Sequence, residues 1–379
     1  MRKPLRIGFD AKRAYFNRSG LGNYSRNLIN ALSEHYSDAE AEFFLFTPRT
    51  KGGMTLEHSE RLHVVSPQSL VHRMLPAVWR SQWSVNDMIA HGLDVYHGLS
   101  HELPWGIHHT RIRTVLTVHD LIFMRRPQDF NPIDVYIYTK KIKYACHVAD
   151  AIVAISNQTR RDIEELLDVP AAHITLIPQG CNPIFQHLLT SEQLEAVRRK
   201  WDLPTHYLLN VGTIEQRKNL IAILQAMYEY GIDLPLVVIG QRTAYCEKII
   251  APYIASHRME SRVRIINALP NTDLPAVYQM AAAFVYPSLY EGFGIPVIEA
   301  LSSGIPVITS AGTCLEETGG AACLYVHPTD ITELAEAMKH ILTDSTLRAD
   351  LADKAQVHLA RFAPSAIAEE YMNLYQSLV

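Results

Sequence analysis

Two glutamates, Glu291 and Glu299, flank a stretch of seven residues that holds glycines, a proline and apolar side chains. The glycines beside Phe293 allow a bend in which the backbone approaches a ligand closely. Pro296 suits the first position of a helix, because its missing N–H group would have no partner there. A helix start favours an anionic ligand, so the segment predicts an anion-binding loop between two carboxylates. The alternative is a solvated Glu291 and a Glu299 that only complements the helix dipole.

Two adjacent cations, Arg217 and Lys218, follow the predicted strand Leu208 to Val211 and the glycine that comes after it, Gly212. An arginine fork and a lysine point charge both suit a diphosphate. Open α/β sheets bind ligands at the carboxyl ends of their strands, where this pair is expected. The alternative is an ordinary solvated basic pair on a turn.

Polar residues also end a strand in the first half of the chain, where His119-Asp120 follows Thr114 to Val118. A histidine there either contacts a ligand or is a satisfied core residue. Nearer the N-terminus, a loop with Gly20 and Gly22 leads into an amphipathic helix. Ten residues separate Asp10 from Gly20, so the tight glycine turn of nicotinamide-binding proteins is missing.

Motifs for metals and nucleophiles are missing from the sequence. No Asp-x-Asp pair occurs that would hold Mg²⁺ or Mn²⁺, and there is neither a Gly-x-Ser-x-Gly elbow nor a P-loop. The charge of a diphosphate would then be met by Arg217, Lys218 and helix N–H groups. We therefore expect no metal ion and no cofactor.

Apolar strand-like runs alternate with helical ones along the chain, which predicts an α/β protein with parallel sheets. At 379 residues, two domains are expected. A Pro- and Gly-rich linker, Pro178 to Pro183, separates residues 1–182 from 183–364, and a helix with an apolar stripe occupies 365–379. The expected strands are Leu5–Phe9, Glu42–Phe46, Leu62–Val65, Asp94–His97, Thr114–Val118, Ala151–Ile155, Ile174–Ile177, Tyr207–Val211, Leu236–Ile239, Val263–Ile266, Ala283–Tyr286, Val307–Thr309 and Cys323–Tyr325.

Composition indicates a globular protein, with 48% hydrophobic and 20% charged residues. Five cysteines without a Cys-x-x-Cys pair, and no apolar run of membrane-spanning length, lead us to expect a cytoplasmic location. The chain carries 21 basic and 18 acidic residues up to Phe185, against 14 and 21 after it. This modest asymmetry gives no indication of nucleic-acid binding.

The motifs together resemble those of the retaining glycosyltransferases of family 4, the glycosyltransferase group 1 superfamily. The stretch from Glu291 to Glu299 is similar to the family's Glu-x7-Glu signature in its Glu-Gly-Phe-Gly form. Gly212 to Asn219 looks like the family's Gly-Thr-x-Glu-x-Arg-Lys-Asn segment, although Thr213 stands where some relatives carry arginine. The resemblance implies the GT-B fold: two Rossmann-like doubly wound domains facing across a cleft, the first binding the acceptor and the second the nucleotide sugar. The C-terminal helix would cross back to the first domain.

The resemblance also implies a role for each motif. Glu291 would contact hydroxyls of the donor sugar, Glu299 would hold the ribose, and His119 would lie close to the transferred sugar. Asp120 would support His119, and Ser156 matches a family serine of less certain role. The residues expected to be catalytic are His119, Arg217, Lys218 and Glu291. Those expected to bind the donor are Gly20, Gly22, Gly212, Arg217, Lys218, Glu291, Phe293, Gly294, Ile295 and Glu299.

The implied function is metal-independent, retaining transfer of a hexose from a nucleoside diphosphate sugar to a glycan or glycolipid hydroxyl in surface polysaccharide synthesis. Similarity to bacterial mannosyltransferases favours GDP-mannose, with UDP-glucose or UDP-N-acetylglucosamine open. A nucleotide-sugar epimerase of the same fold and a non-catalytic sugar-nucleotide binding protein are the alternatives. Five basic residues of the first domain either meet an anionic lipid-linked acceptor at the inner membrane face or form a solvated helix face; they are Arg125, Arg126, Lys140, Lys141 and Lys143.

Overall fold

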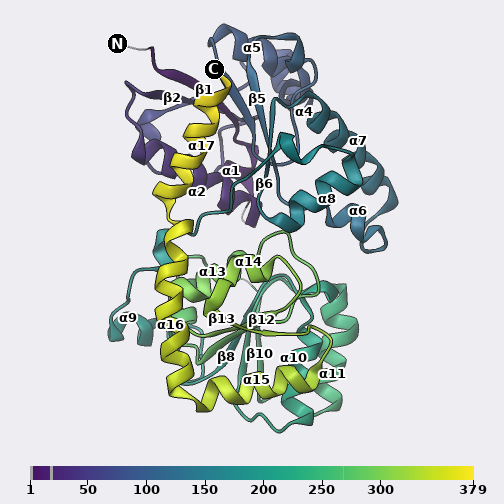
Figure 1. The fold of residues 1–379 in the computed structure, drawn as a ribbon, viewed down its shortest axis with the longest axis vertical. Coiled ribbons are helices and arrows are strands. Elements are labelled where there is room, and N and C mark those ends of the chain that lie inside the picture. Colours follow the sequence, from purple (N-terminus) through teal and green to yellow (C-terminus); the bar gives the residue numbers. More distant parts are fainter. Residues whose placement is uncertain (1–2, 18–19, 268) are drawn as a thin grey trace. The chain divides into compact units, whose positions relative to one another are not determined.

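A computed structural model describes residues 3–17, 20–267 and 269–379, which form two compact units, each built on a parallel sheet (Figure 1). The N-terminal unit comprises the chain up to Gly180 together with Phe362–Val379, and the C-terminal unit comprises Cys181–Arg361. These bounds lie two and three residues before those expected from the sequence, 182 and 364. The predicted α/β architecture is confirmed.

The N-terminal unit has a seven-stranded sheet of order β3-β2-β1-β4-β5-β6-β7, in which all paired strands are parallel. The order reverses between β1 and β4, which makes this the switch point of a doubly wound sheet. The strands are β1 (Leu5–Asp10), β2 (Ala41–Phe46), β3 (Leu62–Val65), β4 (Val95–Gly98), β5 (Arg113–Val118), β6 (Ala151–Ala154) and β7 (Ile174–Leu176). The helices are α1 (Lys12–Phe16), α2 (Gly20–His35), α3 (Leu70–Met74), α4 (Pro76–Val78), α5 (Ser84–Ala90), α6 (Ile122–Arg125), α7 (Pro132–Val148), α8 (Asn157–Leu167) and α17 (Pro364–Leu378).

The C-terminal unit repeats the scheme with a six-stranded parallel sheet of order β10-β9-β8-β11-β12-β13. Its switch point lies between β8 and β11. The strands are β8 (Leu208–Val211), β9 (Leu236–Ile239), β10 (Val263–Ile266), β11 (Ala283–Tyr286), β12 (Val307–Ser310) and β13 (Cys323–Val326). The helices are α9 (Ser191–Lys200), α10 (Leu220–Glu229), α11 (Ala251–Ser256), α12 (Leu274–Gln279), α13 (Ile295–Ser302), α14 (Leu315–Gly319), α15 (Ile331–Thr343) and α16 (Ser345–Leu359).

Each predicted strand is present, and no bound differs from its prediction by more than one residue. The central strands are easy to recognise because helices cover both faces of a doubly wound sheet, which leaves continuous apolar runs. All four residues of β8, β9 and β11 are buried, for example.

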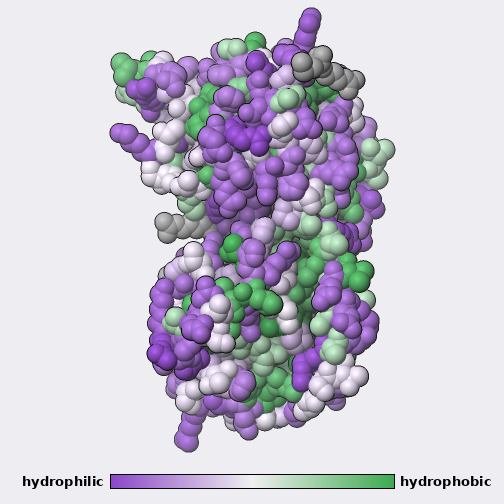
Figure 2. Space-filling model, turned by 90° about the vertical axis from the view of Figure 1, so that its left-hand side faces the viewer, coloured by the Kyte–Doolittle hydropathy of each residue, from purple (hydrophilic) through white to green (hydrophobic). Residues whose placement is uncertain are grey.

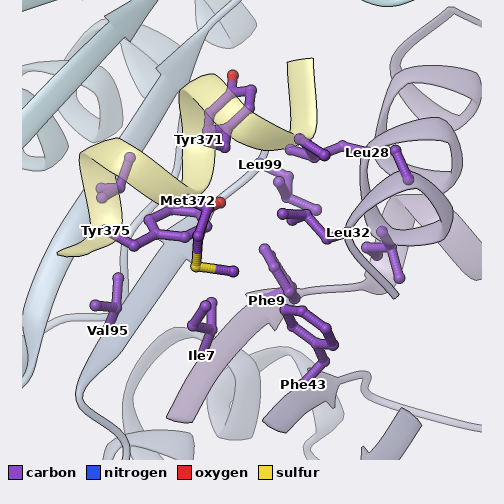
Figure 3. Packing of buried hydrophobic residues seen from close by; sticks show 14 of the residues in the cluster. Ile7, Phe9, Leu28, Leu32, Phe43, Val95, Leu99, Tyr371, Met372 and Tyr375 are labelled. Carbon is purple, nitrogen blue, oxygen red and sulfur yellow. The ribbon is translucent and has the colours of Figure 1, made fainter. Parts of the chain in front are cut away.

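Helix α17 completes the core of the N-terminal unit, as predicted for the last helix of the chain (Figure 1). Its Tyr371, Met372 and Tyr375 lie over Phe9 and Leu28, which come from β1 and α2 (Figure 3). The buried tyrosine hydroxyls are satisfied: Tyr371 lies 2.6 Å from the hydroxyl of Tyr24, and Tyr375 lies 2.7 Å from Nδ1 of His97. The end of the chain is therefore an integral part of this unit.

Candidate functional site

The switch point of the C-terminal sheet brings the predicted basic pair and the predicted carboxylate loop together. Strand β8 leads to Arg217 and Lys218, its neighbour β11 leads to Glu291, and the two segments are joined by a backbone hydrogen bond of 2.7 Å from Leu289 to Arg217. Nη1 of Arg217 lies 2.9 Å from one carboxylate oxygen of Glu291, and Nζ of Lys218 lies 2.6 Å from the other. Charged groups from two segments distant in sequence thus form one cluster.

The Glu291 carboxylate is buried and ionised. Besides the two cations it accepts hydrogen bonds from the hydroxyls of Ser288 (2.6 Å) and Tyr286 (3.0 Å). Burial by itself would raise the pKa of Glu291, but Lys218 and Arg217 outweigh it and lower the pKa to about 2. A carboxylate held by this many donors is a positioning group rather than an unengaged nucleophile.

The Lys218 ammonium group is partly buried against the same partners. Its Nζ contacts the hydroxyl of Tyr286 and lies 5.0 Å from the centre of that ring. Burial lowers the pKa of Lys218, while Glu291 raises it. Nε of Arg217 also lies 2.9 Å from the carboxylate of Glu215, so two carboxylates, Glu215 and Glu291, balance the two cations of the cluster.

The glycine loop after Glu291 has a backbone that other residues could not adopt easily. Gly294 has φ +114°, and a Cβ atom there would come within 2.4 Å of a side-chain carbon of Leu315. Helix α13 begins directly after it at Ile295, one residue before the predicted start at Pro296. The loop therefore ends at a helix N-terminus, where Pro296 has no N–H group and the N–H of Val297 donates a bond of 2.9 Å to the carbonyl oxygen of Gly294.

Two residues of the next strand-to-helix segment anchor this loop. Sγ of Cys314 lies 3.1 Å from the carbonyl oxygen of Glu291, and the hydroxyl of Thr318 donates a bond of 2.6 Å to that of Phe293. The sequence reasoning missed both residues. Their position after β12, the strand beside β11, is the signal that could have identified them.

Glu299 lies on α13 in a different electrostatic environment. It is buried, and its one hydrogen bond within the described residues comes from the Tyr278 hydroxyl at 2.9 Å. Burial raises the pKa of Glu299 to about 7, although the tyrosine lowers it. The two glutamates of the motif thus differ in charge near neutral pH, with Glu291 ionised and Glu299 close to half protonated.

His119 is buried in the N-terminal unit, and both ring nitrogens are engaged there. Nε2 lies 2.8 Å from the carbonyl oxygen of Leu99, and Nδ1 lies 2.8 Å from the side-chain amide of Gln179. Burial, and then His101, lower the pKa of His119 to about 3, so the ring is neutral. The partner of the ring is Gln179, which the sequence reasoning did not identify.

The other expected residues of this unit also have local structural partners. Asp120 accepts a hydrogen bond of 3.1 Å from the backbone of Ile122, and Ser156 caps α8 by accepting one of 3.0 Å from Thr159. Gly20 and Gly22 do not form a loop, which corrects the prediction, because both lie in the first turn of α2. Gly22 is needed for packing: a Cβ atom there would lie 1.8 Å from the carbonyl oxygen of Asn17.

Comparison with known proteins agrees with this geometry. The family described as glycosyl transferases group 1 matches residues 193–358, and glycosyltransferase family 4 matches residues 18–184. This chain belongs to the family 4, group 1 glycosyltransferases. The two matches fall on the two units. The basic pair and both glutamates lie within residues 193–358, the match to glycosyl transferases group 1.

Similar proteins extend over the whole length of this glycosyltransferase. The O-antigen chain mannosyltransferase B of Escherichia coli is 27% identical over 99% of this chain and 100% of its own. The structure of Anabaena Alr3699/HepE with UDP and glucose has a TM-score of 0.75 at 16% identity, covering 98% of this chain and all of the other. A sucrose-phosphate synthase from Thermosynechococcus elongatus has a TM-score of 0.77 at 21% identity, covering 100% and 99%. These structures share the fold of this glycosyltransferase.

Two other kinds of feature are missing from the described residues of the glycosyltransferase. Within residues 3–17, 20–267 and 269–379, no three His, Cys, Asp or Glu side chains are grouped as metal ligands. No helix in that part of the chain is both long and apolar enough to cross a membrane. The face drawn in Figure 2 mixes hydrophilic and hydrophobic residues.

Proposed function

We propose that this glycosyltransferase moves mannose from GDP-mannose to a glycan hydroxyl with retention of configuration and without a metal ion, in the synthesis of a surface polysaccharide. The observation that carries the proposal is the cluster of Arg217, Lys218 and Glu291 at the switch point of the C-terminal sheet. Its arginine fork and lysine ammonium group lie where open α/β sheets bind ligands, and both side chains suit a diphosphate.

In the proposed reaction the bond between C1 of the sugar and the diphosphate oxygen breaks, and the electron pair leaves with the diphosphate. Arg217 and Lys218 stabilise the charge that develops on this leaving group. The acceptor hydroxyl oxygen forms a new bond to C1 on the face that the diphosphate vacates, and its proton passes to a diphosphate oxygen. Glu291 positions the sugar hydroxyls, and no covalent glycosyl-enzyme is required.

The remaining donor contacts are proposed for groups that surround the cluster. The loop of Phe293, Gly294 and Ile295 would bring backbone N–H groups to the phosphates, and Glu299 would hold the ribose. The N–H of Gly212 is bonded to Ile239 at 2.8 Å, so Gly212 would contribute by letting the backbone approach the phosphates closely. Gly20, Gly22 and His119 are proposed to act from the N-terminal unit. Because both nitrogens of His119 are engaged with Leu99 and Gln179, we propose that its ring shapes the sugar site without exchanging a proton.

Mannose is favoured because relatives along the whole chain or large parts of it are named as mannosyltransferases. The UDP and glucose bound by a structural neighbour make UDP-glucose the comparison donor.

A direct test measures release of the nucleoside diphosphate from GDP-mannose and from UDP-glucose, with and without an α-mannoside acceptor and with EDTA. NMR of the product should show an α-linkage that EDTA does not prevent. A β-linkage or loss of activity in EDTA would contradict the retaining or metal-independent part of the proposal.

The same test separates the two other functions. An epimerase would convert the sugar of the donor in the absence of any acceptor. A non-catalytic binding protein would bind the donor and raise its own melting temperature, but would release no nucleoside diphosphate. Transfer that depends on the acceptor would exclude both.

We also propose that the protein is cytoplasmic and that α7 touches the inner face of a membrane that carries a lipid-linked acceptor. Ile133 and Tyr136 on this helix are 68% and 60% exposed. Of the five basic residues first considered, Arg125, Arg126 and Lys141 form ion pairs with acidic residues, which leaves Lys140 and Lys143 for anionic lipid. Vesicles containing anionic lipid should pellet the protein, and replacing both exposed apolar residues by serine should reduce this. Equal pelleting with neutral vesicles would contradict the charge contribution.

A further inference from the structure

A cavity of about 360 Å³ lies at the switch point of the N-terminal sheet, whereas the charged cluster belongs to the C-terminal unit. Asp10 at the end of β1 lines it, as do Tyr96 in β4 and Glu102 after β4. This edge is where doubly wound sheets bind ligands. The volume lies at the small end of the roughly 300–1,000 Å³ typical of ligand sites, so a compact ligand fits best.

The polar wall of the cavity is a preassembled ion network. Arg80 lies between two carboxylates, with Nη2 2.5 Å from Asp10 and Nη1 2.8 Å from Glu102. Nζ of Lys141 lies 3.1 Å from the other oxygen of Glu102. With Lys12 included, three basic and two acidic groups line the cavity, a formal excess of one positive charge. The paired ions offer both donors and acceptors to the hydroxyl groups of a sugar.

Trp105 and Tyr144 give the cavity an aromatic platform. The ring of Trp105 stacks on that of Tyr144 at 3.7 Å and 26°, yet Trp105 remains 46% exposed. Because Tyr144 covers one face, the exposed area belongs to the other face and the edges. The loop is held in place by bonds from the Trp105 backbone to Ser81 (2.7 Å) and from the Gly106 backbone to Tyr144 (2.9 Å). A rigid aromatic face attracts the polarised C–H groups of a sugar ring.

A second cavity, of about 220 Å³, shares Glu102 and Lys141 with the first. Its lining includes Leu21, between the two glycines of α2, and Asp120, next to His119. The second cavity therefore adjoins the residues proposed to act on the donor, and the first cavity is the next compartment along the same edge.

We infer that the two cavities are consecutive sugar sites for a neutral glycan acceptor: the second takes the residue whose hydroxyl is glycosylated, and the first takes the preceding residue, stacked on Trp105. This inference rests on the proposed function and specifies its acceptor. It assigns Trp105 a part in recognising the length of the acceptor rather than in bond formation.

The test compares acceptors that fill one site or both. With GDP-mannose as donor, Trp105→Ala should lower kcat/KM for α-linked mannotriose about tenfold, the scale of a lost aromatic anchor. It should leave kcat/KM for methyl α-mannoside and the hydrolysis of donor in water unchanged, and Trp105→Phe should retain most activity on mannotriose. An equal loss on both acceptors, or no loss on mannotriose, would overturn the assignment.

Direct binding keeps the inference testable if the proposed function fails. Saturation-transfer NMR with mannotriose and no donor should show contact with the wild-type protein and with the matched variant Tyr228→Ala, an aromatic residue of the C-terminal unit that is 50% exposed. The signal should be lost in Trp105→Ala at an unchanged melting temperature. Displacement of mannotriose by inorganic phosphate would identify an anion site and overturn the inference. Sugar binding without any binding of nucleotide sugar would instead refute only the proposed function.

Discussion

Gln179 donates a hydrogen bond of 2.8 Å to Nδ1 of His119, and this bond fixes the tautomer of the ring. Since the amide can only donate from its nitrogen, Nδ1 is the acceptor and Nε2 carries the proton that is directed at the carbonyl oxygen of Leu99. Gln179 lies next to Gly180, the last residue of the first of the two chain segments that make up the N-terminal unit. The contact therefore ties the end of this unit to the end of β5.

Replacing Gln179 by methionine should leave Nδ1 of His119 buried and without a partner. We expect the free energy of unfolding to fall by about 1–3 kcal/mol, the cost of an unsatisfied buried acceptor. Chemical denaturation measures this, with the exposed Gln186→Met as control. The ¹⁵N shifts of His119 should show the Nε2-protonated tautomer in the wild type. An Nδ1-protonated ring would contradict the geometry.

Loss of Lys218 or Glu291 should reduce turnover on the order of 10²-fold or more, because each removes a preorganised charge. Lys218→Met also leaves Glu291 less well paired, so we expect a clear fall in melting temperature. The effects of the two substitutions should be strongly non-additive in a double-mutant cycle, since the side chains touch. Lys354→Met removes only a half-exposed ion pair on α16 and should change neither quantity. Additive effects would argue against a shared cluster.

The two glutamates should affect stability in opposite directions with pH. Glu299 has a folded-state pKa raised to about 7, so its contribution is fully present below its unfolded pKa of 4.5 and is lost as pH rises through 7. Glu299→Gln cannot ionise, so its stability relative to the wild type should grow between pH 4.5 and 7 and then level off. Urea unfolding at several pH values measures this difference, and a constant offset would be inconsistent with a raised pKa.

Glu291 provides the opposite case. Its folded-state pKa is lowered to about 2, so the stability it contributes is present above pH 4.5 and is lost as pH falls towards 2. The difference in unfolding free energy between the wild type and Glu291→Gln should therefore shrink on acidification. If the difference instead grew below pH 4.5, the carboxylate would not be ionised in the native cluster.

Substitution of Gly294 by alanine tests the shape of the loop. The new Cβ atom would meet Leu315 at 2.4 Å in addition to the strain of φ +114°. Gly231 supplies the matched control, because it has φ +64° but no neighbouring atom within 4 Å of the position that a Cβ atom would take. Gly231→Ala should cost about 1–2 kcal/mol, the left-handed penalty alone. Gly294→Ala should cost more and should also weaken donor binding, which calorimetry with GDP detects.

Local sequence was enough to predict the strands and the final helix, and it predicted the start of α13 to within one residue. Strands such as β8 and β11 are buried on both sides, so each is a continuous run of mostly apolar residues that can be recognised in the sequence. The motifs around Arg217 and Glu291 could be recognised for the same reason, since each is a continuous segment.

Tertiary structure decided what these segments contact. Arg217 meets Glu291 because β8 and β11 pair across the switch point. His119 is neutral because burial, and then His101, lower its pKa, and Gln179 and Leu99 reach its ring from other segments. The glycines of α2 looked like a loop because glycine is a poor helix former, but close packing against Asn17 requires Gly22 within the helix. Charge state, tautomer and close approach depend on neighbours in space, and residue order along the chain does not specify those neighbours.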